Sequence, residues 1–227
     1  MFILAPFYDM RFGGKGGIMS VTITCVNKEY IVQQRTLIIL KPDAVQRGLI
    51  GEIIGRFEKI GLKIIGAKFF IPTEELLNKH YPLERKEFIA GMGQKTLDNY
   101  KELGLNPHDY FGTDDAYEIG KTVQRWLVDF MVSAPVFAVV LEGPHAIEIV
   151  RKVRGHTLPL KAEPGTITGD YSFDSSSLAN NEQRPIRNLV HASGNQEEAE
   201  FEIRLWFKPE ELFDYDTAHQ PIKVSNR

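Results

Sequence analysis

The segment Thr36-Leu37-Ile38-Ile39-Leu40 is a short, almost continuously apolar run that ends at Lys41. A strand with one solvated face alternates apolar and polar residues, whereas a strand covered on both faces does not. The run therefore predicts a central strand that is covered on both sides. Lys41, followed by Pro42 and Asp43, is expected to point into a cleft at the end of this strand. The alternative at such a position is an exposed lysine without a function.

The segments around this strand alternate in type. Ile53, Ile54 and Phe57 recur at helical spacing, and Val136 begins a second run rich in valine. The predicted elements are a helix at 51–60, a strand at 63–71, a helix capped by Thr73, a strand at 136–141, a helix at 144–154 and a helix at 195–206. The order of strand, helix, strand, helix, strand, helix, strand is typical of a compact α+β domain.

The stretch between Gly91 and Pro135 predicts a helical hairpin. Its second half has apolar residues at i, i+4, i+7, i+8 and i+11, which are Ile119, Val123, Trp126, Leu127 and Phe130. Asn106 and Pro107 separate this amphipathic helix from a shorter one around 97–103. An apolar face of this kind must be covered, either by the same domain or by a neighbouring subunit, and the sequence leaves both open.

Composition limits the class of protein. The chain has 227 residues, of which 43% are hydrophobic, and a net charge of −3, which argues against nucleic acid as its main partner. The single cysteine, Cys25, excludes an intrachain disulfide and fits a reducing compartment. Residues 1–33 lack the features of a secretion signal. We expect a cytoplasmic protein with no membrane partner, consisting of an N-terminal extension at 1–33 and one domain at 34–227.

A candidate nucleophile lies in the segment Arg187-Asn188-Leu189-Val190-His191-Ala192-Ser193. An imidazole, whose ordinary pKa is about 6.5, is largely unprotonated and nucleophilic at neutral pH. A single histidine after an apolar run is more often a packed or surface residue, so His191 needs support from its surroundings. The helix predicted at 195–206 provides it, because Glu202 on that helix is expected to bind one ring nitrogen and leave the other free.

Five blocks of this sequence, taken in order, resemble the nucleoside diphosphate kinase family. They are Thr36 to Gly55, Phe88 to Gly91, Pro135 to Thr157, Pro164 to Asp170 and Arg187 to Phe207. The resemblance covers most of residues 35–215. It implies a ferredoxin-like β-α-β-β-α-β sandwich with an antiparallel sheet. The helical hairpin is then an insertion at about 94–130, and a segment rich in Ser and Asn is a second insertion at about 172–184.

The same resemblance implies an activity and a set of site residues. Members of the family transfer the terminal phosphate of a nucleoside triphosphate to a nucleoside diphosphate through a phosphohistidine, which implies a ping-pong mechanism on His191. The residues implied are His191, Lys41 and Glu202 for catalysis, and Lys41, Tyr81, Phe88, Arg151, Thr157 and Asn188 for nucleotide binding. Phe88 would stack on the base, with a core position as the alternative. For Arg151 the alternative is an ordinary exposed helix arginine.

The resemblance also implies partners. Mg²⁺ would accompany the nucleotide phosphates, and we expect no metal-binding cluster of protein side chains. A homo-oligomer, either a tetramer or a hexamer, is implied as well.

The chain departs from the family at Thr168, where an arginine that contacts the terminal phosphates is usual. Threonine offers one hydroxyl and no charge. Arg184, within the second insertion, is the candidate to compensate for it, and the alternative is that nothing replaces the missing charge. The rival hypothesis is a nucleotide-binding regulatory protein, or a structural oligomer of the same fold, with weak turnover because of Thr168.

Overall fold

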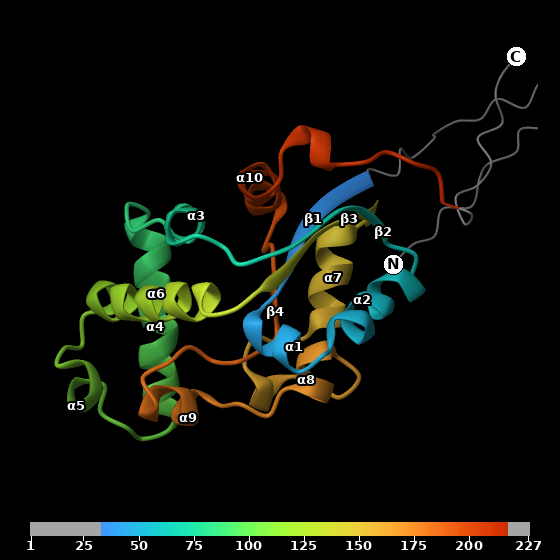
Figure 1. Ribbon diagram of the computed structural model, residues 1–227. Coiled ribbons are helices and arrows are strands. Elements are labelled where there is room, and N and C mark those ends of the chain that lie inside the picture. Colours follow the sequence, from blue (N-terminus) through green and yellow to red (C-terminus); the bar gives the residue numbers. More distant parts are fainter. Residues whose placement is uncertain (1–32, 218–227) are drawn as a thin grey trace, which may run out of the picture. The chain divides into compact units, whose positions relative to one another are not determined.

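The computed structural model describes residues 33–217 (Figure 1). The expectations for the N-terminal extension and for Cys25 concern residues outside this range. The strands are β1 (Gln33–Leu40), β2 (Lys63–Phe70), β3 (Val136–Pro144) and β4 (Val190–Ala192). The α-helices are α1 (Pro42–Gln46), α2 (Ile50–Lys59), α3 (Glu74–His80), α4 (Lys86–Glu102), α5 (His108–Phe111), α6 (Ala116–Val132), α7 (Ala146–Arg154), α8 (Ile167–Tyr171), α9 (Ser176–Asn181) and α10 (Gln196–Trp206). Short 3₁₀ turns occur at Pro159–Lys161 and Pro209–Glu211.

The four strands form one antiparallel sheet in the order β2-β3-β1-β4. The predicted α+β fold with an antiparallel sheet, consistent with the ferredoxin-like sandwich, is confirmed. β1 is a central strand, as its apolar run predicts. It pairs with β3 along its whole length, and Ile39 on its other side is opposite His191 of β4. The end of β1 is therefore next to the candidate nucleophile.

Helices cover both faces of the sheet, and side chains of β1 alternate between the two cores. Ile38 and Leu40 pack into one core with residues of α2, α7 and α8. Leu37 and Ile39 pack into the other core with residues of α3, α6 and α10. All four side chains are fully buried. The absence of polar residues from this run follows from that double coverage.

The region predicted as a helical hairpin is built from α4 and α6, which contact each other closely. α4 begins at Lys86 and has 17 residues, so it is much longer than the helix expected around 97–103. Backbone meets backbone where the two helices touch. A Cβ atom on Gly93 would collide with the carbonyl of Ala116, and one on Gly120 would collide with the carbonyl of Ile89. Glycine at these positions permits the close approach.

The apolar face predicted for α6 is wrong in detail. The buried residues are Ile119, Gly120, Gln124, Val128 and Met131, whereas Val123, Trp126, Leu127 and Phe130 are only partly buried. The buried stripe is rotated because a polar residue faces inward. The amide nitrogen of Gln124 donates to Asn78 Oδ1 at 3.1 Å and to the Tyr81 carbonyl at 3.2 Å. A pattern based on apolar residues alone misses a buried glutamine that has hydrogen-bond partners.

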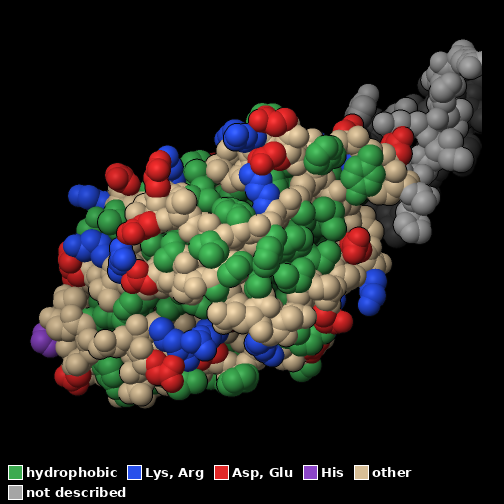
Figure 2. Space-filling model, in the orientation of Figure 1, with side chains coloured by type: hydrophobic (Ala, Val, Ile, Leu, Met, Phe, Trp, Pro, Cys, Tyr) green, Lys and Arg blue, Asp and Glu red, His purple; other side chains and the backbone are tan. Residues whose placement is uncertain are grey.

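The surface carries apolar residues at the edge of the sheet. β2 is an edge strand, and the exposed fraction is 58% for Phe69 and 57% for Ile71, just beyond it. Figure 2 shows hydrophobic side chains gathered across the middle of the face in view. Within residues 33–217, helices that are long and apolar enough to cross a membrane are absent.

The glycine contact between α4 and α6 predicts a stability difference. Gly93→Ala should lower the free energy of unfolding by about 1–3 kcal/mol or more, because the added methyl group would collide with backbone atoms of Ala116 and Gly120 in α6. Gly91→Ala on the same helix is the control, since its Cβ would meet no atom within 4 Å. That change should stabilise the protein by roughly 0.5–1 kcal/mol. Urea unfolding of both variants measures the difference, and equal midpoints would contradict the predicted contact.

Candidate functional site

His191 lies on β4, next to the end of β1. Its neighbours Val190 and Ala192 are buried in the core under α2 and α7. Because side chains alternate along a strand, His191 points to the opposite face, toward α3 and α10. Its side chain remains 18% exposed.

The carboxylate of Glu202, on α10, holds the ring of His191. The Nε2 atom of His191 lies 2.9 Å and 3.0 Å from the two carboxylate oxygens, and the Ser193 hydroxyl donates to Oε2 at 2.6 Å. Burial opposes ionisation of Glu202, but His191 outweighs it and the pKa of Glu202 falls to about 2. An ionised carboxylate only accepts hydrogen bonds, so Nε2 carries the hydrogen. The Nδ1 lone pair of His191 is then left free.

The start of α10 sets the position of Glu202. Asn195 caps the helix by accepting from the Glu198 amide at 2.9 Å, and Glu198 accepts from the Gly194 amide at 2.8 Å. Both contacts follow directly after β4, so the helix begins at a fixed place relative to His191. Glu202 then falls on the buried side of the helix, beside Ile203 and Trp206.

His80 completes this cluster, and nothing in the sequence pattern pointed to it. The Trp206 indole N–H donates to His80 Nδ1 at 3.1 Å, which places the hydrogen of a neutral ring on Nε2. Burial keeps the ring neutral by lowering the pKa of His80 to about 3. Its Nε2 faces Glu202 Oε1 at 3.7 Å, and its ring centroid is 4.7 Å from that of His191.

Tyr81, one of the predicted nucleotide-binding residues, lies against the same cluster. Its ring packs edge-on to His80 with the centroids 4.4 Å apart, and burial raises the pKa of its hydroxyl. The residue is 7% exposed. Tyr81 is therefore close to His191, on the side of α3.

Lys41 and Asn188 form a second polar group. The Lys41 ammonium donates to Asn188 Oδ1 at 2.6 Å, and Asn188 Nδ2 donates to the Thr157 carbonyl at 2.8 Å. The pKa of Lys41 falls to about 8, chiefly because the group is buried; nearby Asp43 raises the pKa and Arg154 lowers it. Three predicted residues are thus joined in one hydrogen-bonded chain.

A strained turn presents Asn188. The next residue, Leu189, has φ of 68°, a conformation that costs a non-glycine residue about 1–3 kcal/mol. The buried carboxylate of Asp43 accepts from the Leu189 amide at 3.0 Å, and the Leu189 carbonyl accepts from the Lys41 amide at 2.8 Å. Asp43 therefore stabilises the turn and places Asn188 beside Lys41.

The last turn of α7 and the loop after it add more cationic groups. Arg151 is exposed, and within residues 33–217 it has no ion-pair partner. Arg154, which sequence reasoning missed, donates to Thr157 Oγ1 at 3.1 Å. The signal available for Arg154 was its position one helical turn after Arg151. Phe88 is partly buried in the first turn of α4, where the Arg85 guanidinium lies 5.4 Å from its ring centroid.

The structure shows where Thr168 and Arg184 lie. Thr168 is 1% exposed on α8, and its hydroxyl has no hydrogen-bond partner among residues 33–217. Arg184, the candidate to compensate for it, is already paired with carboxylates. Its guanidinium binds Asp174 in a bidentate contact at 2.6 Å and 3.0 Å, and Asp174 also accepts from the Arg187 amide at 2.7 Å. Arg184 holds together the segment around the short helix α9.

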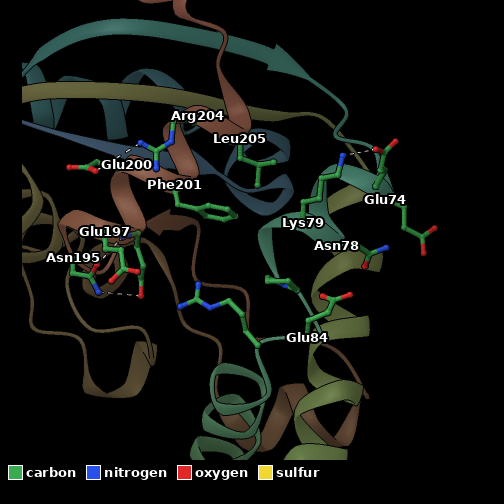
Figure 3. A pocket seen from close by; sticks show the side chains of 14 residues that line it. Glu74, Asn78, Lys79, Glu84, Asn195, Glu197, Glu200, Phe201, Arg204 and Leu205 are labelled. Atoms are coloured by element: carbon green, nitrogen blue, oxygen red, sulfur yellow. Dashed lines mark hydrogen bonds and ion pairs between the residues drawn. The ribbon is translucent and has the colours of Figure 1, made fainter.

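A separate hollow of about 1030 Å³ opens between α3 and α10 (Figure 3). Asn78 and Lys79 of α3 face Glu200 and Arg204 of α10 across it, and Phe201 projects between them. None of the predicted site residues lines this hollow. It lies on the outer side of α10, and the candidate site is the partly open region around His191 and Lys41.

The family model for nucleoside diphosphate kinase matches residues 34–94 and 116–212. The chain belongs to the nucleoside diphosphate kinase family. This confirms the resemblance found in the sequence. The matched ranges include every element of the sheet and all predicted site residues. Residues 95–115, which contain the second half of α4 and all of α5, lie between the two matched ranges.

Relatives named nucleoside diphosphate kinase match most of the chain. The protein of Pyrobaculum aerophilum is 51% identical over 80% of this chain and 98% of its own length. That of Pyrococcus horikoshii is 42% identical over 82% of this chain and 92% of its own length.

Solved structures of nucleoside diphosphate kinases also resemble this chain. A crystal structure of an NDP kinase from P. aerophilum has a TM-score of 0.78 at 50% identity and covers 81% of this chain and all of that one. A transition-state mimic of the kinase from Borrelia burgdorferi, with bound vanadate and ADP, has a TM-score of 0.65 at 37% identity and covers 83% of this chain and 95% of that one.

The hydrogen bonds around Glu202 predict the tautomers of two histidines. Under mildly alkaline conditions, ¹⁵N NMR should show both His80 and His191 with hydrogen on Nε2. Glu202→Ala should turn His191 into a tautomer mixture while His80 keeps its form. Trp206→Phe should leave His191 unchanged and affect only His80. Hydrogen on Nδ1 of His191 in the wild-type protein would contradict this arrangement.

Proposed function

We propose that this chain transfers the terminal phosphate of a nucleoside triphosphate to a nucleoside diphosphate through a phosphohistidine on His191. The observation that supports the role of His191 is its geometry: Glu202 occupies Nε2, so the free Nδ1 can attack phosphorus. The family to which the chain belongs carries out this transfer between nucleotides.

The reaction has two balanced steps. In the first, the Nδ1 lone pair forms a bond to the terminal phosphorus while the bond from phosphorus to the bridging oxygen breaks, and the nucleoside diphosphate leaves with that electron pair. In the second, a terminal oxygen of another diphosphate attacks the phosphorus and the bond to Nδ1 breaks. Glu202 stabilises the positive charge that the ring gains once Nδ1 is phosphorylated.

Cationic groups and hydrogen-bond donors next to His191 would hold the phosphates. Lys41, Arg151, Thr157 and Asn188 are the residues proposed for this role. Most catalysis of phosphoryl transfer comes from positioning and from neutralising charge on the transferring group. Lys41 is suited to this role because its ammonium group is held by Asn188 Oδ1 at 2.6 Å. The side chain therefore needs little reorganisation when phosphate binds.

Phe88 and Tyr81 would contact the nucleotide at either end. Phe88 is only partly buried, so part of its ring is open to stack on a base, and stacking tolerates any base. Tyr81 lies beside the His191 cluster, on the side where the phosphates would enter.

Mg²⁺ would be supplied with the nucleotide, coordinated by the phosphate oxygens, where it would neutralise charge and orient the transferring group. Within residues 33–217, the group of side chains with metal-ligand spacing is His80, His191 and Glu202. This group does not fit a metal. Both imidazoles carry hydrogen on the nitrogen that faces the carboxylate, and Mg²⁺ prefers oxygen ligands. We assign no protein side chain to the ion.

The rival, a protein that binds nucleotides without useful turnover, rests on Thr168. Family membership and the intact cluster of Lys41, Asn188, His191 and Glu202 favour the enzyme. Incubation with γ-labelled ATP separates the two. The enzyme becomes labelled at an acid-labile position and loses the label when a nucleoside diphosphate is added, whereas the rival remains unlabelled.

We also propose a tetramer or hexamer in the cytoplasm. The exposed apolar residues at the edge of the sheet and the half-buried side of α6 are surfaces that a second copy would cover. The single Cys25 suits a reducing compartment. A mass measurement in solution distinguishes a tetramer from a hexamer, and a monomer at working concentration would overturn the oligomer.

Removal of the nucleophile should separate chemistry from binding. His191→Ala should abolish phosphotransfer and labelling while nucleotide affinity stays within about threefold of wild type, since other side chains make the contacts. His108→Ala, at an exposed position in α5, is the control and should keep full activity. Turnover above background in His191→Ala would contradict the proposed mechanism.

The low pKa of Lys41 predicts proton uptake on binding. Free Lys41 titrates at about 8, and a bound phosphate should raise this pKa because it favours the charged form. At pH of about 8.5, binding of ADP should therefore take up at most about three quarters of a proton, and uptake should vanish as the pH falls below about 6.5. Calorimetry in buffers of different ionisation enthalpy measures it. Lys41→Arg, whose charge does not titrate, should abolish the uptake.

A further inference from the structure

Arg154 is a partly buried cation without an anionic partner. It lies in the last turn of α7, where Nε donates to the Gly155 carbonyl at 3.2 Å and an Nη atom donates to Thr157 Oγ1 at 3.1 Å. Both acceptors are neutral. Within residues 33–217, Arg154 forms no ion pair with a carboxylate. A guanidinium has five N–H donors, so most of its capacity is unused.

The surroundings of Arg154 are cationic as well. Burial and the nearby Arg151 lower the pKa of Arg154 to about 10, and Arg154 in turn lowers the pKa of Lys41. Asp43 is the carboxylate that acts on Lys41, and it raises the pKa of the ammonium group. Partly desolvated positive charges of this kind are unfavourable unless an anion neutralises them. A ligand with several negative charges suits the site.

Arg154 is connected to the predicted phosphate-binding residues by hydrogen bonds. It contacts the hydroxyl of Thr157, whose carbonyl accepts from Asn188, and Asn188 in turn accepts from Lys41. Neither Thr168 nor Arg184 can supply the missing charge. Thr168 is buried and uncharged, and Arg184 is bound to Asp174 and Glu182.

We propose that Arg154 binds the phosphates of the nucleotide and supplies the positive charge that Thr168 lacks. The inference rests on the proposed function, since it requires a polyphosphate at Lys41 and Thr157. The planar fork of arginine suits this role, because it can contact two phosphate oxygens at once while it keeps its place beside Thr157. The charge is then delivered from the end of α7 instead of from α8.

The first test is nucleotide affinity as a function of phosphate number. Arg154→Ala should weaken ADP and ATP binding by about 10- to 100-fold, as expected for the loss of charge-assisted hydrogen bonds, and should leave adenosine binding unchanged. Arg154→Lys should recover part of the loss. Lys152→Ala is the matched control, because it removes one exposed charge from the same helix and should change affinity less than about twofold.

A merely structural role for Arg154 would give a different result. If the side chain only shaped the loop at Thr157, Arg154→Lys would restore nothing, and if it supported the whole site, adenosine and ADP would be weakened equally. Either result overturns the proposal, and so does wild-type ADP affinity in Arg154→Ala.

The second test is a double-mutant cycle with Thr168→Arg. If Arg154 compensates for Thr168, the loss caused by Arg154→Ala should shrink below about threefold in the Thr168→Arg background. An undiminished loss there would overturn the compensation. Because Thr168 is buried and an arginine at that position can impair folding, the affinity series with Arg154→Ala and Arg154→Lys stands independently of this cycle.

Labelling of His191 separates this inference from the proposed function. At saturating γ-labelled ATP, Arg154→Ala should still acquire acid-labile phosphate, more slowly than wild type. Failure of the wild-type protein to become labelled would refute the proposed function. Normal labelling of wild type, together with normal ADP affinity in Arg154→Ala, would refute only the role of Arg154.

Discussion

The buried carboxylate of Glu202 is the group on which the arrangement of this site depends. A buried charge is tolerated only when it is paired and hydrogen-bonded, and Glu202 meets that requirement with His191, Ser193 and the nearby edge of His80. These partners come from β4 and α3, and the Ser193 hydroxyl also accepts from the Leu37 amide of β1 at 3.3 Å. One carboxylate therefore ties together the sheet and the two helices beside the nucleophile.

The local sequence contains most of the information for the fold. Double coverage of β1 follows from the uninterrupted run Leu37 to Leu40, and the helix cap at Thr73 and the helix after His191 form as predicted. The pairing of Glu202 with His191 also follows from sequence. Only a short turn and the first part of the helix lie between the two residues, so the helix brings Glu202 back toward His191. These features depend on residues that are close in the chain, for which periodicity and capping rules apply.

Contacts between residues far apart in sequence were not accessible in the same way. The bond between Trp206 and His80 spans 126 positions, and no pattern in either segment signals it. The orientation of α6 was mispredicted because Gln124 is buried, which becomes favourable only once Asn78 and Tyr81 are in place. Arg184 was a candidate to replace the missing charge because no motif in the sequence signals its ion pair with Asp174. In each case tertiary hydrogen bonding overrides the simple preference of the residue for water.

The length of α4 has a consequence for the shape of the nucleotide cleft. This helix has 17 residues and is about 25 Å long. Phe88, the ring proposed to stack on the base, lies in its first turn, and Glu102 at its other end pairs with Lys161 at 3.0 Å, four residues after Thr157. The helix thus connects the ring proposed to stack on the base with the loop proposed to hold the phosphates. Because α6 packs against the middle of α4 through close backbone contacts, the position of α4 is fixed by α6 as well as by the loops at its two ends.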